Sequence, residues 1–461
     1  MTEPADLSAV DLLAGFASGA LSPSECWDSV ERRIAAWEPT VAALYAYDPE
    51  GARREAAAAT ERWARGAPKG RLDGLPVSVK ELIATRGVPV PRGCAATKLV
   101  PAAADAPPAA RLREDGAVIF AKTTCPDHGM LTSGLSSFHP LTRNPWDPAL
   151  NPGGSSSGAG AAAAAGYGPL HVGTDIGGSI RLPAALTGTV GFKPSNGRIP
   201  IDPYYLGRCA GPMTRGVADA ALAMATLARP DGRDHTALPP EALAWDALDM
   251  DVGGLRIGLM RDAGCGLAVD AETDAAVVAA ARVFAAAGAR IEPVGPVLTR
   301  AMLDGLDVFW RARAWGEIGP LPATERDRIL PYILAWAEGG ARVSGVEALA
   351  GLDATYAMRR ACGRLFDGVD VVLSPTIPVP SYPAEWASPL DDPARPFEHI
   401  AFTVPWNMSE QPALSLPCGS SAAGLPLGLQ IVGPRFADLA VLRLGAFYEA
   451  ARGPMPPWPS P

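Results

Sequence analysis

The chain has 461 residues and a formal net charge of −9 at pH 7, and 48% of its residues are hydrophobic. It is long enough to bury a large core, and its negative balance argues against nucleic acid or an anionic membrane as the main partner. The seven cysteines are scattered and contain no C-x-x-C pair, which is typical of reduced thiols rather than of a disulfide framework or a zinc site.

The N-terminal residues MTEPADLSAVDLL lack the basic segment that begins a secretion signal. No uncharged apolar stretch is long enough to span a membrane, since such a span needs about 20 apolar residues. We therefore expect a soluble, cytoplasmic protein.

Residues 1–66 are expected to form an N-terminal helical segment. Residues 7–16 are amphipathic, and Ser22 to Glu25 form a capping box with proline at the first helical position. From residue 74, short apolar runs alternate with helical patterns: 77–79 and 118–121 predict strands, and 107–114 predicts a helix between them. This alternation predicts an α/β fold whose large mixed β-sheet is covered by helices on both faces.

Residues 229–254 contain several prolines and are expected to cross the surface. A strand at 255–260, a helix at 271–287 and late strands at 371–374 and 412–417 are predicted to follow. The helical stretch 297–365 is rich in large apolar side chains, which suit either a lid or pocket wall or plain core: Phe309, Trp310, Trp315 and Trp336. We expect one domain over 1–461, with a catalytic core at 74–228.

Lys80 ends the apolar run 75–79 in a chain that holds only five lysines, at positions 69, 80, 98, 122 and 193. Arginine stays charged at every accessible pH, whereas a buried lysine can lose its proton near neutrality. Lys80 is therefore a candidate base, and the alternative is a lysine that pairs with Glu81 or caps a strand end.

Residues 154–158 read GSSSG, which resembles the G-x-S-x-G nucleophile elbow. That elbow follows a strand, but the proline-containing stretch 145–152 is unsuited to a central strand. The catalytic triad that accompanies this elbow would also need a downstream histidine. The candidates are His171, His235 and His399, and none lies in a sequence motif that indicates catalysis.

Residues 158–163 read GAGAAA and match the dinucleotide-binding pattern G-x-G-x-x-A. This pattern also requires a preceding strand, and a lone match in an Ala/Gly-rich segment is weak. A non-catalytic nucleotide-binding module is therefore a minor alternative.

Residues 173–179 read GTDIGGS and follow a short predicted strand at 170–172. Consecutive glycines leave backbone N–H groups uncovered beside Ser179, as an oxyanion hole requires. The alternative is a purely structural role for these glycines, in a tight turn packed against the sheet. A second glycine-flanked serine, Ser155, lies 24 residues upstream, so two serines and a lysine favour a hydrolase whose nucleophile is activated by an amine.

These motifs together resemble the amidase signature family over nearly the whole chain. The matching segments are GLPVSVKE at 74–81, GGSSSG at 153–158, the stretch 173–200, GPMTR at 211–215, residues 412–417 and GLPLGLQ at 424–430. Ser157 departs from the pattern, because many relatives carry a second glycine there.

The resemblance implies that Ser179 is the nucleophile, Ser155 the bridging serine and Lys80 the base, with a cis Gly154–Ser155 peptide bond. It implies an oxyanion hole formed by N–H groups of Ile176, Gly177, Gly178 and Ser179. It also places Gly129, Met130 and Leu131 near the acyl site. No metal or cofactor is expected.

Members of this family act on diverse amides, esters, ureas and carbamates. Met130, Leu131 and the tryptophans of 297–365 favour a small apolar or aromatic amide, with carbamates (urethanes) and esters as further candidates. We expect a monomeric or homodimeric enzyme with a small-molecule substrate. The alternative is a glutaminase-type A subunit of an amidotransferase, which requires partner chains.

Overall fold

The protein is described here by a computed structural model that covers residues 2–461. Its strands are β1 (Leu44–Tyr45), β2 (Pro76–Lys80), β3 (Val118–Thr123), β4 (Leu170–Asp175), β5 (Val190–Lys193), β6 (Cys209–Thr214), β7 (Arg256–Leu259), β8 (Arg290–Pro293), β9 (Val371–Pro375), β10 (Ala413–Ser420) and β11 (Pro426–Val432). Its α-helices are α1 (Ala9–Ser18), α2 (Pro23–Val41), α3 (Pro49–Ala64), α4 (Pro107–Glu114), α5 (Ser157–Ala165), α6 (Arg181–Thr187), α7 (Val217–Leu227), α8 (Ala271–Ala286), α9 (Arg300–Ile318), α10 (Ala323–Arg326), α11 (Pro331–Glu338), α12 (Gly345–Leu365), α13 (Val404–Met408) and α14 (Asp438–Ala451).

All eleven strands belong to one sheet, in the order β1-β3-β2-β4-β6-β5-β10-β11-β9-β7-β8. The strand β2 runs parallel to β3 and β4, and β7 runs parallel to β8 and β9. The strands between these groups pair antiparallel. The expected large mixed sheet of an α/β fold is therefore confirmed.

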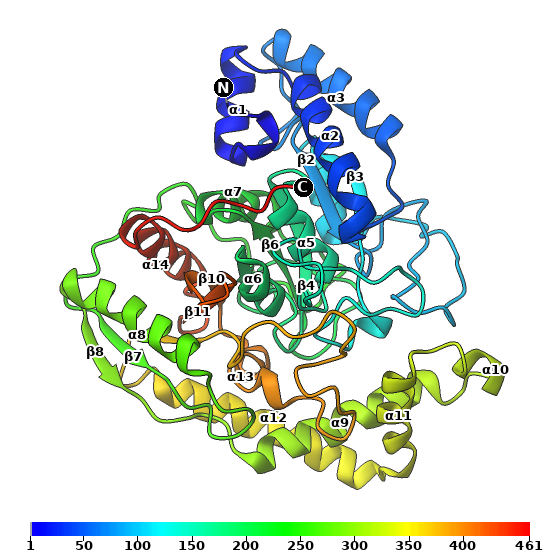
Figure 1. Ribbon diagram of the computed structural model, residues 1–461, viewed down its shortest axis with the longest axis vertical. Coiled ribbons are helices and arrows are strands. Elements are labelled where there is room, and N and C mark those ends of the chain that lie inside the picture. Colours follow the sequence, from blue (N-terminus) through cyan, green and yellow to red (C-terminus); the bar gives the residue numbers. More distant parts are fainter. Residues whose placement is uncertain (1) are drawn as a thin grey trace.

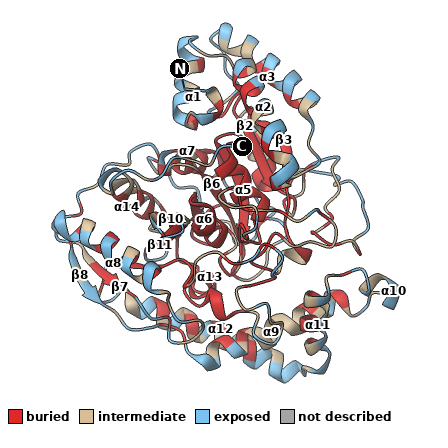
Figure 2. Ribbon diagram, in the orientation of Figure 1, coloured by how far each residue is buried: buried red, intermediate tan, exposed pale blue. Residues whose placement is uncertain are grey.

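Helices surround this sheet (Figure 1). The first three helices lie at the top of the view, and α9 to α12 lie at the bottom, with most of the strands between them. The burial colouring follows the same arrangement: the central strands with α5 and α6 are buried, whereas the outer helices are buried along one side only (Figure 2). None of the helices within residues 2–461 combines the length and apolar character that a bilayer crossing requires.

Several predicted elements agree closely with the structure. The helix 107–114 is α4, and the predicted strands 77–79, 118–121, 170–172 and 371–374 lie inside β2, β3, β4 and β9. The capping box at Ser22 is present, with the Ser22 hydroxyl and the Glu25 carboxylate each bonded to the other residue's backbone N–H. Boundaries differ by at most three residues, the largest difference being the end of β4 at Asp175.

The helices α5 and α6 have no counterpart among the elements that the sequence pattern predicts. Every residue of both helices is buried, so neither has the polar face that reveals a helix by its periodicity. Small side chains make this burial feasible: a Cβ at Gly160 would lie 3.0 Å from the Pro183 Cβ, which shows how closely α5 approaches α6. Ser155 and Ser179 each lie two residues before one of these helices, so the tightly packed helices hold both serines.

Candidate active site

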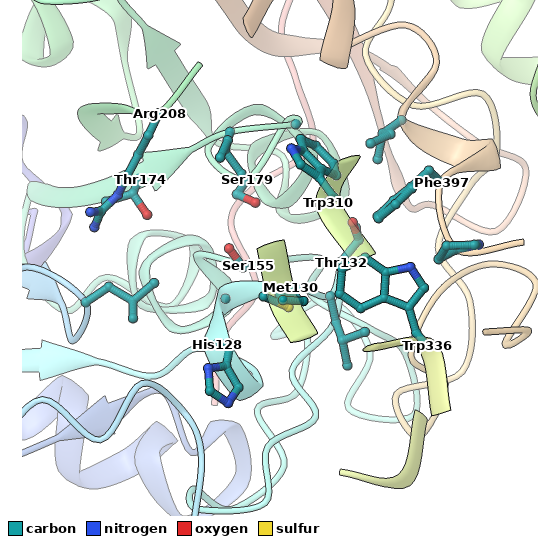
Figure 3. A pocket seen from close by; sticks show the side chains of 18 of the residues that line it. His128, Met130, Thr132, Ser155, Thr174, Ser179, Arg208, Trp310, Trp336 and Phe397 are labelled. Atoms are coloured by element: carbon teal, nitrogen blue, oxygen red, sulfur yellow. The ribbon is translucent and has the colours of Figure 1, made fainter. Parts of the chain in front are cut away.

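A cavity of about 260 Å³ lies above the ends of β2 and β4 and contains both predicted serines. The segment after β4 contributes Ile176, Gly177 and Ser179 to its wall, and the loop before α5 contributes Ser155. Figure 3 shows the Ser155 and Ser179 side chains facing the same space. Ser155 is only 2% exposed, whereas Ser179 is only partly buried and reaches the open part of the cavity.

Lys80, the last residue of β2, contacts Ser155. Its Nζ donates a hydrogen bond to the Ser155 Oγ at 2.7 Å, and the Lys80 side chain is completely buried. The Gly154–Ser155 peptide bond is cis, as the family resemblance implied. The fold thus brings the end of β2 into contact with the loop before α5, 75 positions further along the chain.

Burial lowers the pKa of Lys80 to about 8. The nearby positive charge of Arg208 lowers it further, and the acidic groups of Cys125, Asp175 and Glu81 act in the opposite direction. Because a desolvated ammonium is disfavoured, about a tenth of Lys80 is uncharged at pH 7, far more than for an exposed lysine. An uncharged amine hydrogen-bonded to a hydroxyl is suited to accept its proton.

Lysine scarcity alone would not have identified this base. Lys122 and Lys193 are also buried, and burial lowers the pKa of both. The Nζ of Lys122 donates to the Ile83 carbonyl at 2.6 Å, and that of Lys193 donates to the Pro194 carbonyl at 3.0 Å. What distinguishes Lys80 is its contact with a serine in a cavity.

Ser156 joins the segment that carries Ser155 to the segment that carries Ser179 through two hydrogen bonds. The Ser156 N–H donates to the Ser179 carbonyl at 3.1 Å, and the Ser156 hydroxyl donates to the Thr174 carbonyl at 3.1 Å. No hydrogen bond joins the Ser155 and Ser179 hydroxyls among residues 2–461. The structure therefore brings Lys80, Ser155 and Ser179 to one place, with a direct bond only between the first two.

The segment 176–179 presents free backbone donors beside Ser179. Within residues 2–461, no hydrogen bond uses the N–H groups of Ile176, Gly177 or Ser179. The N–H of Gly178 instead donates to the Asp175 carboxylate at 2.8 Å. The prediction that all four N–H groups of residues 176–179 are oxyanion-hole donors is therefore corrected. The Gly178 N–H is already paired, which leaves three free donors in this segment.

Glycine is required in this turn. Gly178 has φ +131°, and a Cβ there would lie 2.6 Å from the Thr403 Oγ1. A Cβ at Gly177 would lie 3.3 Å from the Trp310 ring. The two glycines thus permit a backbone path and a close approach of Trp310 that side chains would block.

A buried ion pair braces the same turn. Arg181 contacts Asp175 through Nη2 at 3.0 Å, and both side chains are inaccessible to solvent. Arg181 also donates to the Gln430 side chain at 2.7 Å and to the Asn407 side chain at 2.6 Å. Burial alone would raise the pKa of Asp175, but Arg181 outweighs burial and holds that pKa well below its usual range.

Asp175 and Arg181 are not among the site residues predicted from the sequence. The available signal was an acidic and a basic residue six positions apart in a segment that is otherwise uncharged. Since a buried charge needs a partner, this pair could have been predicted to support the turn.

The two other interpretations of the glycine-rich segment do not fit the structure. No strand precedes residues 154–158 after β3 ends at Thr123, so neither a nucleophile elbow nor a dinucleotide fold is present there. None of the three histidines is hydrogen-bonded to Ser155 or Ser179 among residues 2–461. His171 contacts the Ser78 hydroxyl at 2.7 Å, and His235 packs against Tyr204. His399 lines the cavity, but its ring contacts the Thr132 hydroxyl at 2.7 Å. Burial lowers the pKa of His171 and of His399 to about 3.

One end of the cavity is aromatic. Trp310 of α9 and Trp336 of α11 both pack edge-on against Phe397, and all three line the cavity (Figure 3). Trp315 and Phe309 of the same helical stretch are not among the lining residues, so only part of that stretch contributes to the wall. The predicted residues Gly129, Met130 and Leu131 all line the cavity.

The opposite end is basic, and none of its residues is among those predicted from the sequence. Arg92, Arg208 and Arg313 line it together with Tyr205. These arginines lie far apart in a chain with many arginines, so nothing in their sequence context distinguished them.

Comparison with known proteins identifies relatives over the whole chain. A family model described as Amidase matches residues 27–442. The chain is 34% identical to the A subunit of the glutamyl-tRNA(Gln) amidotransferase of Myxococcus xanthus, covering 96% of this chain and 97% of that protein. It is 33% identical to an acylamidase of Rhodococcus erythropolis, covering 98% and 96%. The crystal structure of a bacterial aryl acylamidase of the amidase signature family superposes with a TM-score of 0.89 at 30% identity, covering 96% of each chain.

Proposed function

Since the chain belongs to the amidase signature family and is an amide C–N hydrolase, we propose that it cleaves small amides with an apolar or aromatic group through an acyl-enzyme on Ser179. The observation that carries this proposal is the 2.7 Å contact between buried Lys80 and Ser155, in the cavity that Ser179 also lines. Burial that lowers the pKa of Lys80 to about 8 supports its role as the base.

In the proposed mechanism, uncharged Lys80 accepts a proton from Ser155, and Ser155 accepts one from Ser179 as the Ser179 Oγ attacks the substrate carbonyl. The resulting oxyanion is stabilised by free N–H groups of the 176–179 turn, of which Ile176, Gly177 and Ser179 supply the donors. Ser155 then returns a proton to the leaving nitrogen, because an unprotonated amine is a poor leaving group. Water hydrolyses the acyl-enzyme by the reverse route.

The aromatic end of the cavity supports an apolar or aryl substrate group. Trp310, Trp336 and Phe397 provide a surface that is suited to stacking and to excluding water. The same acyl-enzyme chemistry extends to esters and to carbamates (urethanes), whose carbonyl carbons accept the same nucleophile.

Substrate comparison tests this proposal against the glutaminase-type alternative that several relatives' names suggest. The purified protein alone is expected to hydrolyse p-nitroacetanilide and phenyl carbamates far faster than glutamine. Added hydroxylamine is expected to divert the acyl group to a hydroxamate, as an acyl-enzyme requires. Glutamine hydrolysis without anilide hydrolysis, or activity only with added partner chains, would instead favour the amidotransferase alternative.

The Ser155→Ala variant is expected to lose more activity on amides than on activated esters. Expulsion of an amine needs a proton from Ser155, whereas p-nitrophenolate leaves without one, and a positioned proton donor contributes about 10²–10⁴-fold. The measurement is kcat/KM for a matched anilide and p-nitrophenyl ester in wild type and variant. An equal proportional loss on both substrates would mean that Ser155 only positions Ser179.

A further inference from the structure

The active-site cavity has chemically different ends. Figure 3 shows Arg208 on one side of Ser155 and Ser179, with Trp310, Trp336 and Phe397 on the other. A substrate whose scissile amide lies at the serines therefore extends toward an aromatic surface in one direction and toward a guanidinium in the other.

Arg208 is buried without a carboxylate partner. It is only 7% exposed, and it forms no ion pair with any group among residues 2–461. Its Nη1 donates to the Pro203 carbonyl at 2.6 Å, and its Cζ lies 5.3 Å from the centre of the Tyr205 ring. These contacts hold the guanidinium against the cavity wall and leave other donors free.

The surroundings of Arg208 are also short of negative charge. Glu317 is shared by two arginines, at 2.5 Å from Arg92 and 3.7 Å from Arg313. The Cζ of Arg313 lies 3.8 Å from the Tyr205 ring centre, so Tyr205 contacts two guanidinium groups. Asp202 is near enough to act on Arg208 through its charge but forms no ion pair with it.

Burial of the Arg208 guanidinium without a carboxylate partner carries an energetic penalty. Burial, reinforced by the charges of Arg313 and Arg92, lowers the pKa of Arg208 to about 10, so the group remains positively charged at neutral pH. A buried charge that lacks a partner is unfavourable, and an anion that fits beside it removes the penalty. The planar guanidinium is well suited to bind a carboxylate through paired hydrogen bonds.

We propose that Arg208 binds a carboxylate on the substrate, so that preferred amides carry an apolar or aryl group on one side of the scissile bond and a carboxylate on the other. This inference rests on the proposed amide hydrolysis and names the substrate class for the same cavity. Arg208 is then a specificity-determining residue that touches the substrate away from the reacting bond.

Two pairs of substrates test the proposal in both orientations. The first pair places the charge on the leaving group: N-(4-carboxyphenyl)phenylacetamide against N-(4-acetylphenyl)phenylacetamide. The second pair places it on the acyl group: the anilide of 4-carboxyphenylacetic acid against that of 4-acetylphenylacetic acid. The acetyl compounds are neutral and similar in size, so the ratio of kcat/KM within a pair reports recognition of the carboxylate.

The ratio of kcat/KM within a pair also separates recognition of the substrate carboxylate from an effect of Arg208 on the pKa of Lys80. The charge of Arg208 lowers the pKa of Lys80, so its removal changes the rates of all substrates. That change is common to both members of a pair and cancels in the ratio. A structural disturbance of the loop that Arg208 anchors through Pro203 cancels in the same way.

Wild type is expected to prefer the carboxylated member of at least one pair. Arg208→Gln is expected to reduce that preference by about tenfold to about 100-fold, the range for a hydrogen bond to a charged group. Arg208→Lys, which keeps the charge but loses the planar fork, is expected to retain part of it. Arg313→Gln is the matched control, because Arg313 lines the same end but already contacts Glu317, and its ratio is expected to change less.

Three results would overturn the inference: a wild type that prefers the neutral member of both pairs, an unchanged ratio in Arg208→Gln, or an equal change in Arg313→Gln. Each of these leaves the proposed function intact as long as the neutral anilides are hydrolysed. If neither the neutral nor the carboxylated anilides are hydrolysed, the proposed function itself fails.

Discussion

Replacement of Ser179 by alanine is expected to abolish amide hydrolysis, with a loss of about 10⁴-fold or more in kcat. Ser179 lies in the same turn as the free N–H groups of Ile176 and Gly177 and is the nucleophile of the proposed mechanism, so its loss removes the acyl-enzyme whose oxyanion they stabilise. Hydroxamate formation with hydroxylamine is expected to disappear together with hydrolysis. The measurement is anilide hydrolysis by the purified variant over a long incubation.

Folding must be preserved for this result to be informative. Ser179 is only partly buried and its hydroxyl forms no hydrogen bond within residues 2–461, so the melting temperature of the variant is expected to stay near that of wild type. A folded Ser179→Ala protein with an activity within about tenfold of wild type would exclude Ser179 as the nucleophile.

The Lys80→Arg variant is expected to be nearly as inactive as Lys80→Ala, with losses of at least about 10²–10⁴-fold on amides. Arginine keeps the positive charge but does not release its proton at accessible pH, so it cannot accept the proton of Ser155. The measurement is kcat/KM on the same anilide for wild type and both variants. Substantial activity in Lys80→Arg would show that Lys80 acts through its charge or its packing.

The pH profile of wild type provides an independent check on the same residue. Since the active form of Lys80 is uncharged and burial lowers its pKa to about 8, kcat/KM is expected to rise with pH below about 8 and to level off above it. In Arg208→Gln a positive neighbour is lost, which raises the pKa of Lys80, so the rise is expected to shift to higher pH. A profile that falls across this range would contradict a base with a lowered pKa.

Much of the fold could be predicted from local sequence patterns. The helix 107–114 and the strands within β2, β3 and β4 follow from apolar periodicity and from proline and glycine at the boundaries. The helices α5 and α6 could not be predicted in this way, because they are buried on all sides and their small residues show no amphipathic pattern. Their existence depends on the elements packed around them.

The candidate site also contains both residues that local sequence patterns identify and residues that only the fold brings together. Ser155, Ser179 and Lys80 stand out in the sequence because glycine-flanked serines and a scarce lysine are local signals, and the family motifs reinforce them. The Asp175–Arg181 pair left a weaker signal, and the Gly178 donor was assigned wrongly although the carboxylate that it binds, that of Asp175, lies only three residues earlier in the chain. Aspartate side chains often bind a backbone N–H a few residues further on, so this bond was itself a local signal. The basic end of the cavity gave no such signal, because only the fold brings Arg92, Arg208 and Arg313 to one place.

The sequence by itself determined the chemistry, since the type of a side chain sets whether it can attack a carbonyl or accept a proton. The tertiary structure decided the state of those groups and the shape of the space around them. The pKa of Lys80 depends on its burial beside Ser155, and the two ends of the cavity bring together Trp310 with Phe397 and Arg208 with Tyr205. Desolvation and long-range contact are properties of the folded chain, so reactivity could be foreseen from the residues, whereas the substrate preference proposed here required the cavity.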